Sequence, residues 1–224
     1  MNYFVFSYGG CGSTMLCSFL SQFGRSYHLH DNKPPKFLTD STPPIPITSC
    51  TVRLSQDPAR RLKNENCKVI YIYRNPAESK VSRPSWQHCY HMGGDFLSHK
   101  DKISQGPLKE VNDEENLQIK MDWVEQFASN GIDYNGYEQH FDNWINAVPD
   151  RDYPILYVNY ENLWENLNIL LEYCGVPIEE AVKKFPAKKE TTKAVPDNVT
   201  RKLAHLYSSL QQKINNTGTI WSTT

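Results

Sequence analysis

Apolar residues along the chain form two kinds of pattern, short continuous runs and longer stretches with helical spacing. Three continuous runs, Tyr3–Ser7, Lys68–Arg74 and Tyr153–Tyr160, are typical of strands that are buried on both faces of a sheet. We expect further short strands at Arg25–His30 and Ile47–Leu54. These runs predict the strands of a β-sheet.

Stretches with helical spacing separate these runs. They cover residues 15–23, 117–128, 137–148 and 163–174, and a last helix is expected over about Asp197–Lys213. Asn75 and Pro76 provide the cap and first position of a further helix, which Pro84 should end or kink. The alternation predicts an α/β fold, a single domain over residues 1–224 with a parallel β-sheet flanked by helices. In such sheets, ligands bind beyond the carboxyl ends of the strands.

A glycine-rich turn follows the first predicted strand, where residues 8–14 read YGGCGST. Its three glycines give the backbone unusual freedom and leave the amides accessible to a ligand. Ser13 and Thr14 can cap the helix that follows, and the N-terminus of a helix attracts anions. The turn therefore predicts an anion-binding loop, with a purely structural connection as the alternative.

The loop does not have the Walker A pattern of ATP- and GTP-binding proteins. That pattern would place glycine at position 7 and lysine at position 13, where the chain has Ser7 and Ser13. We therefore do not expect a standard ATP or GTP site.

A second candidate anion site follows the strand predicted at 68–74, in the sequence YRNPAESKVS. Arg74 lies at the strand end, and Ser82 follows eight residues later, about two turns into the next helix. Both side chains donate hydrogen bonds that a phosphate group accepts. The alternative for Arg74 is an ordinary ion pair at a strand end.

Together these motifs resemble those of the PAPS-dependent sulfotransferases, a family with a P-loop-like α/β fold. The sequence SYGGCGSTML is similar to the family's 5′-phosphosulfate loop, and VIYIYRNPAESKVS is similar to its 3′-phosphate motif. Downstream, GYEQHFDNWINA and PILYVNYENLWENLNILLEYCGVP are similar to the segments around the family's YEDL-like signature. The resemblance spans roughly residues 3–185.

The resemblance implies the P-loop-like sulfotransferase fold and a protein that binds PAPS (3′-phosphoadenosine 5′-phosphosulfate) and releases PAP. It assigns the 3′-phosphate, which distinguishes PAPS from ATP, to Arg74 and Ser82. It assigns the 5′ end of PAPS to the loop residues Gly9, Gly10, Cys11, Gly12, Ser13 and Thr14.

The chain departs from the family at two catalytic positions. The family's loop lysine or arginine falls at Gly10, and the catalytic histidine of its cytosolic members falls near Arg53. Arg53 could supply the missing positive charge to the transferring sulfuryl group, or it could be a solvated surface residue. As the base that deprotonates the acceptor, we expect Asp31 first and His30 second, close to where some branches of the family carry a glutamate. The alternatives are a packed or exposed loop histidine for His30, as for the nearby His28, and a turn-forming role for Asp31 next to Asn32.

Composition sets further bounds on the partners of the protein. The chain has 224 residues, of which 22% are charged, and its net charge of −1 gives no general attraction to nucleic acid or anionic membrane. No apolar run reaches membrane-spanning length, and the first predicted strand leaves no room for a signal peptide. Six cysteines without a C-x-x-C pair favour free thiols in a reducing compartment. We therefore expect a soluble, cytoplasmic protein without nucleic-acid or membrane partners.

One group of potential metal ligands, His88, Cys89 and His91, lies in the sequence QHCYHM. A metal site needs three or four supported ligands, and no matching second cluster is found in the sequence. We expect no bound metal.

Three functions remain open from the sequence. The first is a sulfotransferase that transfers the sulfuryl group of PAPS to a hydroxyl or amine of an unidentified small-molecule or glycan acceptor. The second is a catalytically silent module that binds PAP or PAPS. The third is an atypical P-loop kinase that uses ATP and magnesium.

Overall fold

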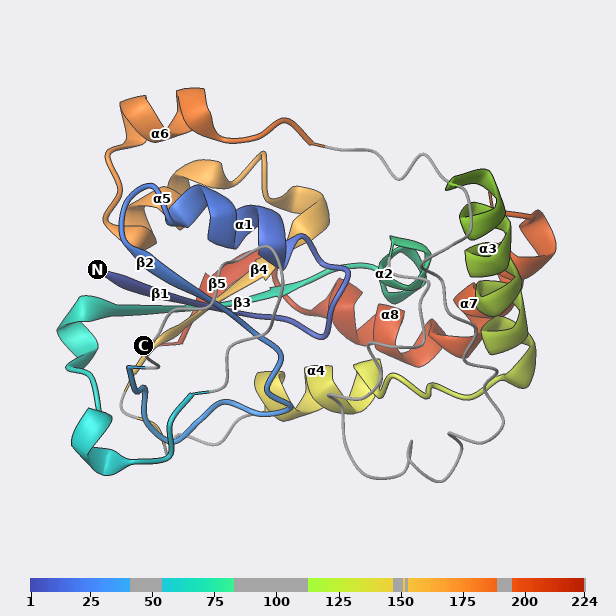
Figure 1. Cartoon of the computed structure of the whole chain (residues 1–224), viewed down its shortest axis with the longest axis horizontal. Coiled ribbons are helices and arrows are strands. Elements are labelled where there is room, and N and C mark those ends of the chain that lie inside the picture. The colour runs from blue at the N-terminus through green and yellow to red at the C-terminus, as the bar shows by residue number, and fades with distance from the viewer. Residues whose placement is uncertain (41–53, 83–112, 147–150, 152, 189–194, 224) are drawn as a thin grey trace.

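The computed structural model describes residues 1–40, 54–82, 113–146, 151, 153–188 and 195–223. Within these ranges, five strands form a sheet in the order β2-β1-β3-β4-β5 (Figure 1). The strands are β1 (Asn2–Phe6), β2 (Arg25–Leu29), β3 (Cys67–Tyr73), β4 (Ile155–Asn159) and β5 (Ile220–Ser222). β1 to β4 are parallel to one another, and β5 runs antiparallel to β4. The α/β fold with a mainly parallel sheet is therefore confirmed.

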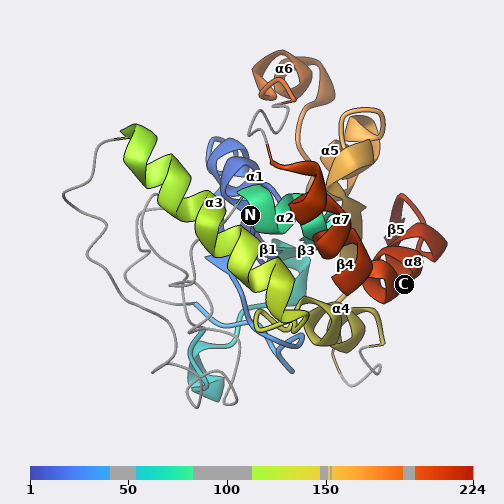
Figure 2. The same cartoon turned by 90° about the vertical axis from the view of Figure 1, so that its right-hand side faces the viewer.

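Helices surround the sheet on both faces and at its carboxyl edge. In the described part of the chain they are α1 (Ser13–Leu20), α2 (Pro76–Ser82), α3 (Asp113–Asn130), α4 (Tyr137–Ile145), α5 (Leu167–Cys174), α6 (Ile178–Lys184), α7 (Asp197–Leu206) and α8 (Ser208–Asn216), with short 3-10 helices η1 (Pro58–Arg60), η2 (Asn64–Asn66) and η5 (Tyr160–Asn162). α1 and α5 cover one face of the sheet, and α4 and α8 cover the other (Figure 1). α2, α3 and α7 gather beyond the carboxyl ends of the strands (Figures 1 and 2).

Residues of β1 show how the two faces of the sheet are filled. The Tyr3 hydroxyl donates to the main-chain oxygen of Cys174 in α5 at 3.3 Å. On the other face, the Phe6 ring lies 4.5 Å from Trp144 of α4, and Trp144 stacks on Tyr71 of β3 at 4.8 Å. Burial on both faces explains why the parallel strands read as continuous apolar runs.

The predicted strands at 3–7, 25–30, 68–74 and 153–160 are confirmed as β1, β2, β3 and β4. The strand expected at 47–54 lies outside the described residues, apart from Leu54. α2 starts at Pro76, as the cap and proline predict, and is described as far as Ser82. Pro84, which was expected to end or kink this helix, lies outside the described residues.

The C-terminal part of the chain differs from the prediction. The single helix expected over about 197–213 is divided into α7 and α8 at Tyr207, whose backbone leaves the helical conformation. The Tyr207 ring is buried and stacks on Tyr137 of α4 at 5.7 Å, so tertiary packing fixes the break. The strand β5 was not predicted. It pairs with β4 and stacks Trp221 on Tyr157 at 4.0 Å.

Candidate functional site

The glycine-rich turn connects β1 directly to α1 at the carboxyl edge of the sheet. Gly9, Gly10 and Gly12 have φ angles of 100°, 69° and 80°, in the left-handed region that residues with side chains rarely adopt. α1 begins at Ser13, immediately after the third of these glycines. The sequence therefore folds into a loop that leads into a helix N-terminus.

The N-terminus of α1 presents main-chain donors at the end of this loop. The Leu16 N–H donates to the Gly12 oxygen at 3.0 Å. Among the hydrogen bonds of the described residues, none uses the N–H groups of Ser13, Thr14 or Met15. Since such N–H groups and the helix dipole favour negative charge, the loop and helix suit a phosphate or phosphosulfate group.

The Ser13 side chain points into the protein and braces the loop. Ser7 Oγ donates to Ser13 Oγ at 2.9 Å, and Ser13 Oγ lies 2.8 Å from His28 Nε2. The side chains of Ser7, Ser13 and His28 are buried, whereas Thr14 is exposed. Ser13 therefore offers its main-chain N–H to an anion, while its hydroxyl ties the loop to β2.

The two candidate bases at the end of β2 have different surroundings. His30 is buried, and its Nδ1 lies 2.6 Å from the main-chain oxygen of Ser7. Because a carbonyl oxygen only accepts, Nδ1 carries the proton in this contact, which leaves Nε2 as the basic nitrogen of the neutral ring. Asp31 is exposed, and its main-chain oxygen accepts a hydrogen bond from Trp144 Nε1 at 2.9 Å. His30 is thus tied to the start of the loop, whereas Asp31 lies at the protein surface.

The centre of the loop packs against α2. A Cβ atom on Gly10 would lie 2.5 Å from the main-chain oxygen of Ser79. Cys11 Sγ donates to the Gly9 oxygen at 3.1 Å and lies 3.6 Å from Ser79 Oγ. Burial raises the pKa of Cys11 to about 12, so the thiol is not a nucleophile at neutral pH. At Gly10, where the sequence resemblance places the family's loop lysine, a side chain would therefore meet the backbone of α2.

Arg74 lies at the end of β3, next to β1 in the sheet, and is joined to the loop by Tyr8. The Arg74 N–H donates to the Tyr8 hydroxyl at 3.1 Å, and the same hydroxyl donates to the Arg74 oxygen. Burial raises the pKa of Tyr8 well above its ordinary value, which keeps the hydroxyl protonated and able to donate. The main chain before the loop and the main chain at Arg74 are therefore held together.

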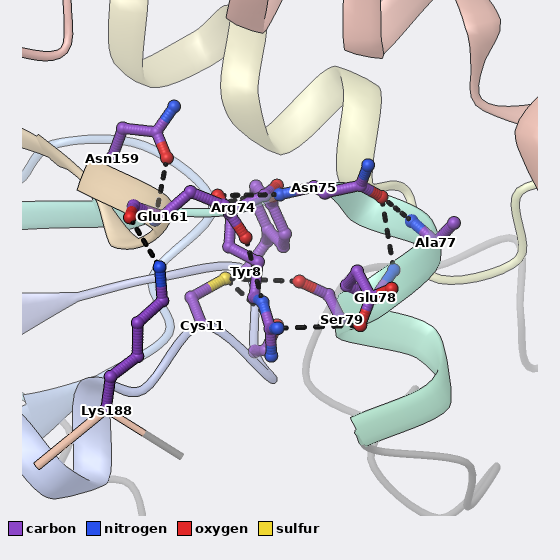
Figure 3. Close-up of polar contacts among 11 residues, drawn as sticks. Tyr8, Cys11, Arg74, Asn75, Ala77, Glu78, Ser79, Asn159, Glu161 and Lys188 are labelled. Carbon is purple, nitrogen blue, oxygen red and sulfur yellow. Dashed lines mark hydrogen bonds and ion pairs between the residues drawn. The ribbon is translucent and has the colours of Figure 1, made fainter. Parts of the chain in front are cut away.

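The Arg74 side chain is almost fully buried and contacts Glu78, Glu161 and Tyr160, of which Figure 3 labels the two glutamates. Its Nε donates to Glu161 Oε1 at 3.1 Å, and its Nη2 lies 3.5 Å from Glu78 Oε2. Its guanidinium carbon lies 4.6 Å from the centre of the Tyr160 ring. Arg74 therefore forms ion pairs at the strand end, which was the alternative to a phosphate contact, but it does so as a buried and not as a surface residue.

Residues after β4 complete this region. Tyr160 packs on the loop, because a Cβ atom on Gly12 would lie 2.5 Å from its Cε2 atom. Lys188 donates to the Glu161 main-chain oxygen at 2.8 Å and lies 5.6 Å from the centre of the Trp164 ring. The ends of β1, β3 and β4 thus contribute to one site.

Other predicted site residues have less structural support. Ser82 is the exposed last residue of α2. Arg53 lies outside the described residues, as do His88, Cys89 and His91. In the part of the chain that is described, no group of three potential metal ligands is found.

Sequence reasoning missed Tyr8, Tyr160 and Glu161 as members of the site. A signal for the last two was available, because they directly follow β4 just as Arg74 directly follows β3. Parallel strands end at the same edge, so residues after each strand deserve equal consideration. Tyr8 follows β1 in the same way and begins the glycine-rich turn, so the same rule applies to it.

The chain belongs to the sulfotransferase domain family, whose model matches residues 2–205. This confirms the resemblance seen in the sequence. A comparison with curated proteins gave no match. Among solved structures, the chain is similar to mouse sulfotransferase SULT7A1 complexed with PAP, at 15% identity and a TM-score of 0.43, covering 96% of this chain and 85% of that chain. None of the described helices is long and apolar enough to span a membrane.

Proposed function

We propose that the protein is a sulfotransferase that transfers the sulfuryl group of PAPS to a hydroxyl or amine of a small-molecule or glycan acceptor. The main support is the placement of two anion-binding elements at neighbouring strand ends, the glycine loop after β1 and Arg74 after β3. The Tyr8 hydroxyl fixes their separation. A nucleotide with phosphate groups at two separate places suits this arrangement better than one with a single phosphate chain.

The residues at the site fit the groups of PAPS. In this proposal, the main-chain donors at the N-terminus of α1 bind the 5′ end, and the Arg74 guanidinium binds the 3′-phosphate. Bound PAPS supplies an activated sulfuryl group, with PAP as the leaving group. The side chains of Ser13 and His28 hold the loop in shape, so the donors are fixed before the nucleotide arrives.

Proton transfer from the acceptor is assigned to the residues after β2. We place Asp31 as the base because its side chain is exposed beyond the strand end. His30 positions the loop through Ser7, and its Nε2 makes it the second candidate. Arg53 stays our candidate for the positive charge that Gly10 does not supply.

One observation favours a second function, a silent module that binds PAP without transfer. The contact between Gly10 and Ser79 excludes a cation from the place where the family carries one. Such a module would bind the nucleotide through the same loop and the same arginine, and it would differ only in turnover.

Calorimetry with PAP, AMP and magnesium-ATP tests the binding site. We expect PAP to bind about tenfold to a hundredfold more tightly than AMP, and Arg74→Ala to remove this preference. Tighter binding of magnesium-ATP than of PAP would contradict the proposal in favour of a kinase. Release of PAP from PAPS over a panel of hydroxyl and amine acceptors then separates the enzyme from the silent module.

A further inference from the structure

The Arg74 guanidinium lies between two carboxylates that come from different elements (Figure 3). Glu161 belongs to η5, after β4, and contacts Nε at 3.1 Å. Glu78 belongs to the first turn of α2 and lies 3.5 Å from Nη2. Among the described residues, the Arg74 guanidinium thus contacts two carboxylates, which occupy donors that a phosphate dianion would use.

The Glu161 contact is fixed by its surroundings. While Oε1 accepts from Arg74, Oε2 accepts from the Asn75 N–H at 3.3 Å. The main-chain N–H of Glu161 donates to Asn159 Oδ1 at 3.0 Å, and the main-chain oxygen of Glu161 accepts from Lys188 Nζ at 2.8 Å. The carboxylate therefore joins the end of β4 to the end of β3, and moving it would break contacts with both the side chain of Arg74 and the main chain of Asn75.

The Glu78 contact is looser. The 3.5 Å separation from Arg74 exceeds an ordinary charge-assisted hydrogen bond, and the Glu78 side chain is 47% exposed, against 10% for Arg74. Glu78 is the exposed partner of this i,i+4 pair, so water can replace the contact when its carboxylate turns outward, and Arg74 keeps its contact with Glu161. Rotation of Glu78 into solvent therefore costs little.

We propose that Glu161 is a positioning residue that holds Arg74 for the 3′-phosphate, whereas Glu78 is a competing anion that the 3′-phosphate displaces. Glu161 then raises the preference for a 3′-phosphorylated nucleotide, and Glu78 lowers it. This inference rests on the proposed function, because it assigns the 3′-phosphate to Arg74.

Whether removal of each carboxylate strengthens or weakens PAP binding distinguishes the two proposed roles from a purely electrostatic effect. Removing any negative charge near the site should strengthen binding of an anion if only the net field matters. Positioning acts the other way, because a guanidinium without its Nε partner adopts more conformations and must be ordered by the ligand. Opposite signs for Glu161 and Glu78 therefore identify two different roles.

The experiment measures the affinities of PAP and AMP for Glu161→Gln and Glu78→Gln by calorimetry. We expect Glu161→Gln to lower the preference for PAP over AMP about fivefold or more. We expect Glu78→Gln to raise this preference about twofold to fivefold, with a smaller gain at high salt. Glutamine has nearly the shape of glutamate, and the amide oxygen at position 161 can still accept from Asn75.

Matched controls make the outcome specific. Glu180→Gln also removes one charge from an exposed i,i+4 pair, with Lys184 on α6, and should leave the preference unchanged. In an Arg74→Ala background, neither Glu161→Gln nor Glu78→Gln should change the preference, whereas a general structural effect would persist.

The possible results separate the inference from the function on which it rests. If the unmodified protein shows no preference for PAP over AMP, both the proposed function and this inference are wrong. If the preference exists and Glu78→Gln fails to raise it, Glu78 is not a competitor. If Glu161→Gln leaves it unchanged or raises it, Glu161 does not position Arg74. Glu78 is exposed on a helix, so its variant stays informative even if Glu161→Gln unfolds the protein.

Discussion

Gly10 lies directly against the main chain of Ser79, so that a Cβ atom on Gly10 would be 2.5 Å from the Ser79 oxygen. The sequence resemblance places the family's loop lysine or arginine at Gly10. There is therefore no space at Gly10 for a longer side chain. The missing side chain is what allows the loop to pack against α2.

We predict that Gly10→Lys weakens PAP binding and stability instead of restoring a family-like site. The added Cβ clashes with a helix backbone, which cannot move aside as a flexible side chain can. Thermal unfolding and calorimetry of Gly10→Ala and Gly10→Lys would show the effect. Gly131→Ala is the matched control, because Gly131 has a φ of 65° and no atom within 4 Å of an added Cβ. If Gly10→Ala and Gly131→Ala lower the free energy of unfolding equally, by about 1 kcal/mol, only the left-handed backbone conformation matters and the contact with Ser79 does not.

Gly12→Ala should weaken PAP and AMP by similar factors. The new methyl group would lie 2.5 Å from Tyr160 Cε2 and distort the start of α1, where the shared 5′-phosphate is expected to bind. Arg74→Ala should instead weaken PAP selectively. If calorimetry finds that Gly12→Ala changes only PAP binding, the two phosphate assignments must be exchanged.

The candidate bases should differ in their kinetic effects. Asp31→Asn should lower kcat about a hundredfold or more and leave PAP affinity nearly unchanged, because only proton transfer is lost. His30→Gln should weaken PAP binding as well, since His30 braces the loop at Ser7. Steady-state kinetics and calorimetry on both variants would test this. Full activity of Asp31→Asn, combined with loss of kcat alone in His30→Gln, would make His30 the base.

His140 should make the protein less stable in mild acid. Its ring is fully buried beside the Tyr71 hydroxyl, and burial lowers its pKa from 6.5 to about 3. Between these values the unfolded state binds more protons than the folded state, so the contribution to stability is complete above about pH 6.5 and is lost as pH falls toward 3. The free energy of unfolding should fall by up to about 1.4 kcal/mol per pH unit from this group.

Urea unfolding at several pH values would measure this slope. His140→Gln keeps a polar partner for Tyr71 and does not titrate, so its stability should depend less on pH than that of the unmodified protein. If the free energies of unfolding of the two proteins change with pH in the same way, the pKa of His140 is not lowered in the folded state and the prediction is wrong.

The sequence predicts the central sheet well because its signal is local. Continuous apolar runs mark β1, β3 and β4, and Gly175, with a φ of 65°, ends α5 where a C-terminal glycine is expected. β5 has three residues and depends on pairing with β4, so no local pattern could identify it. The break at Tyr207 likewise depends on its packing against another helix.

The same distinction holds at the site. The glycine loop and Arg74 stand out because glycine spacing and a strand-end arginine are visible in short windows of sequence. Glu78 is four residues from Arg74, but its other two polar partners are distant along the chain, with 66 positions to Tyr8 and 87 to Glu161. Only the fold brings them together, and the inference about opposed carboxylates could not be made without it.

The antiparallel strand β5 has a consequence for how the protein is made. β4 lies at the edge of the parallel sheet until β5 pairs with it, and β5 consists of residues 220–222. During translation, the glycine loop and Arg74 are therefore synthesised long before the hydrogen-bonding edge of β4 is covered. A nascent chain with such an open edge is prone to pair with other chains. Ribosome stalling before residue 220, or loss of Trp221 from its stack on Tyr157, should thus favour aggregation of an otherwise folded sheet.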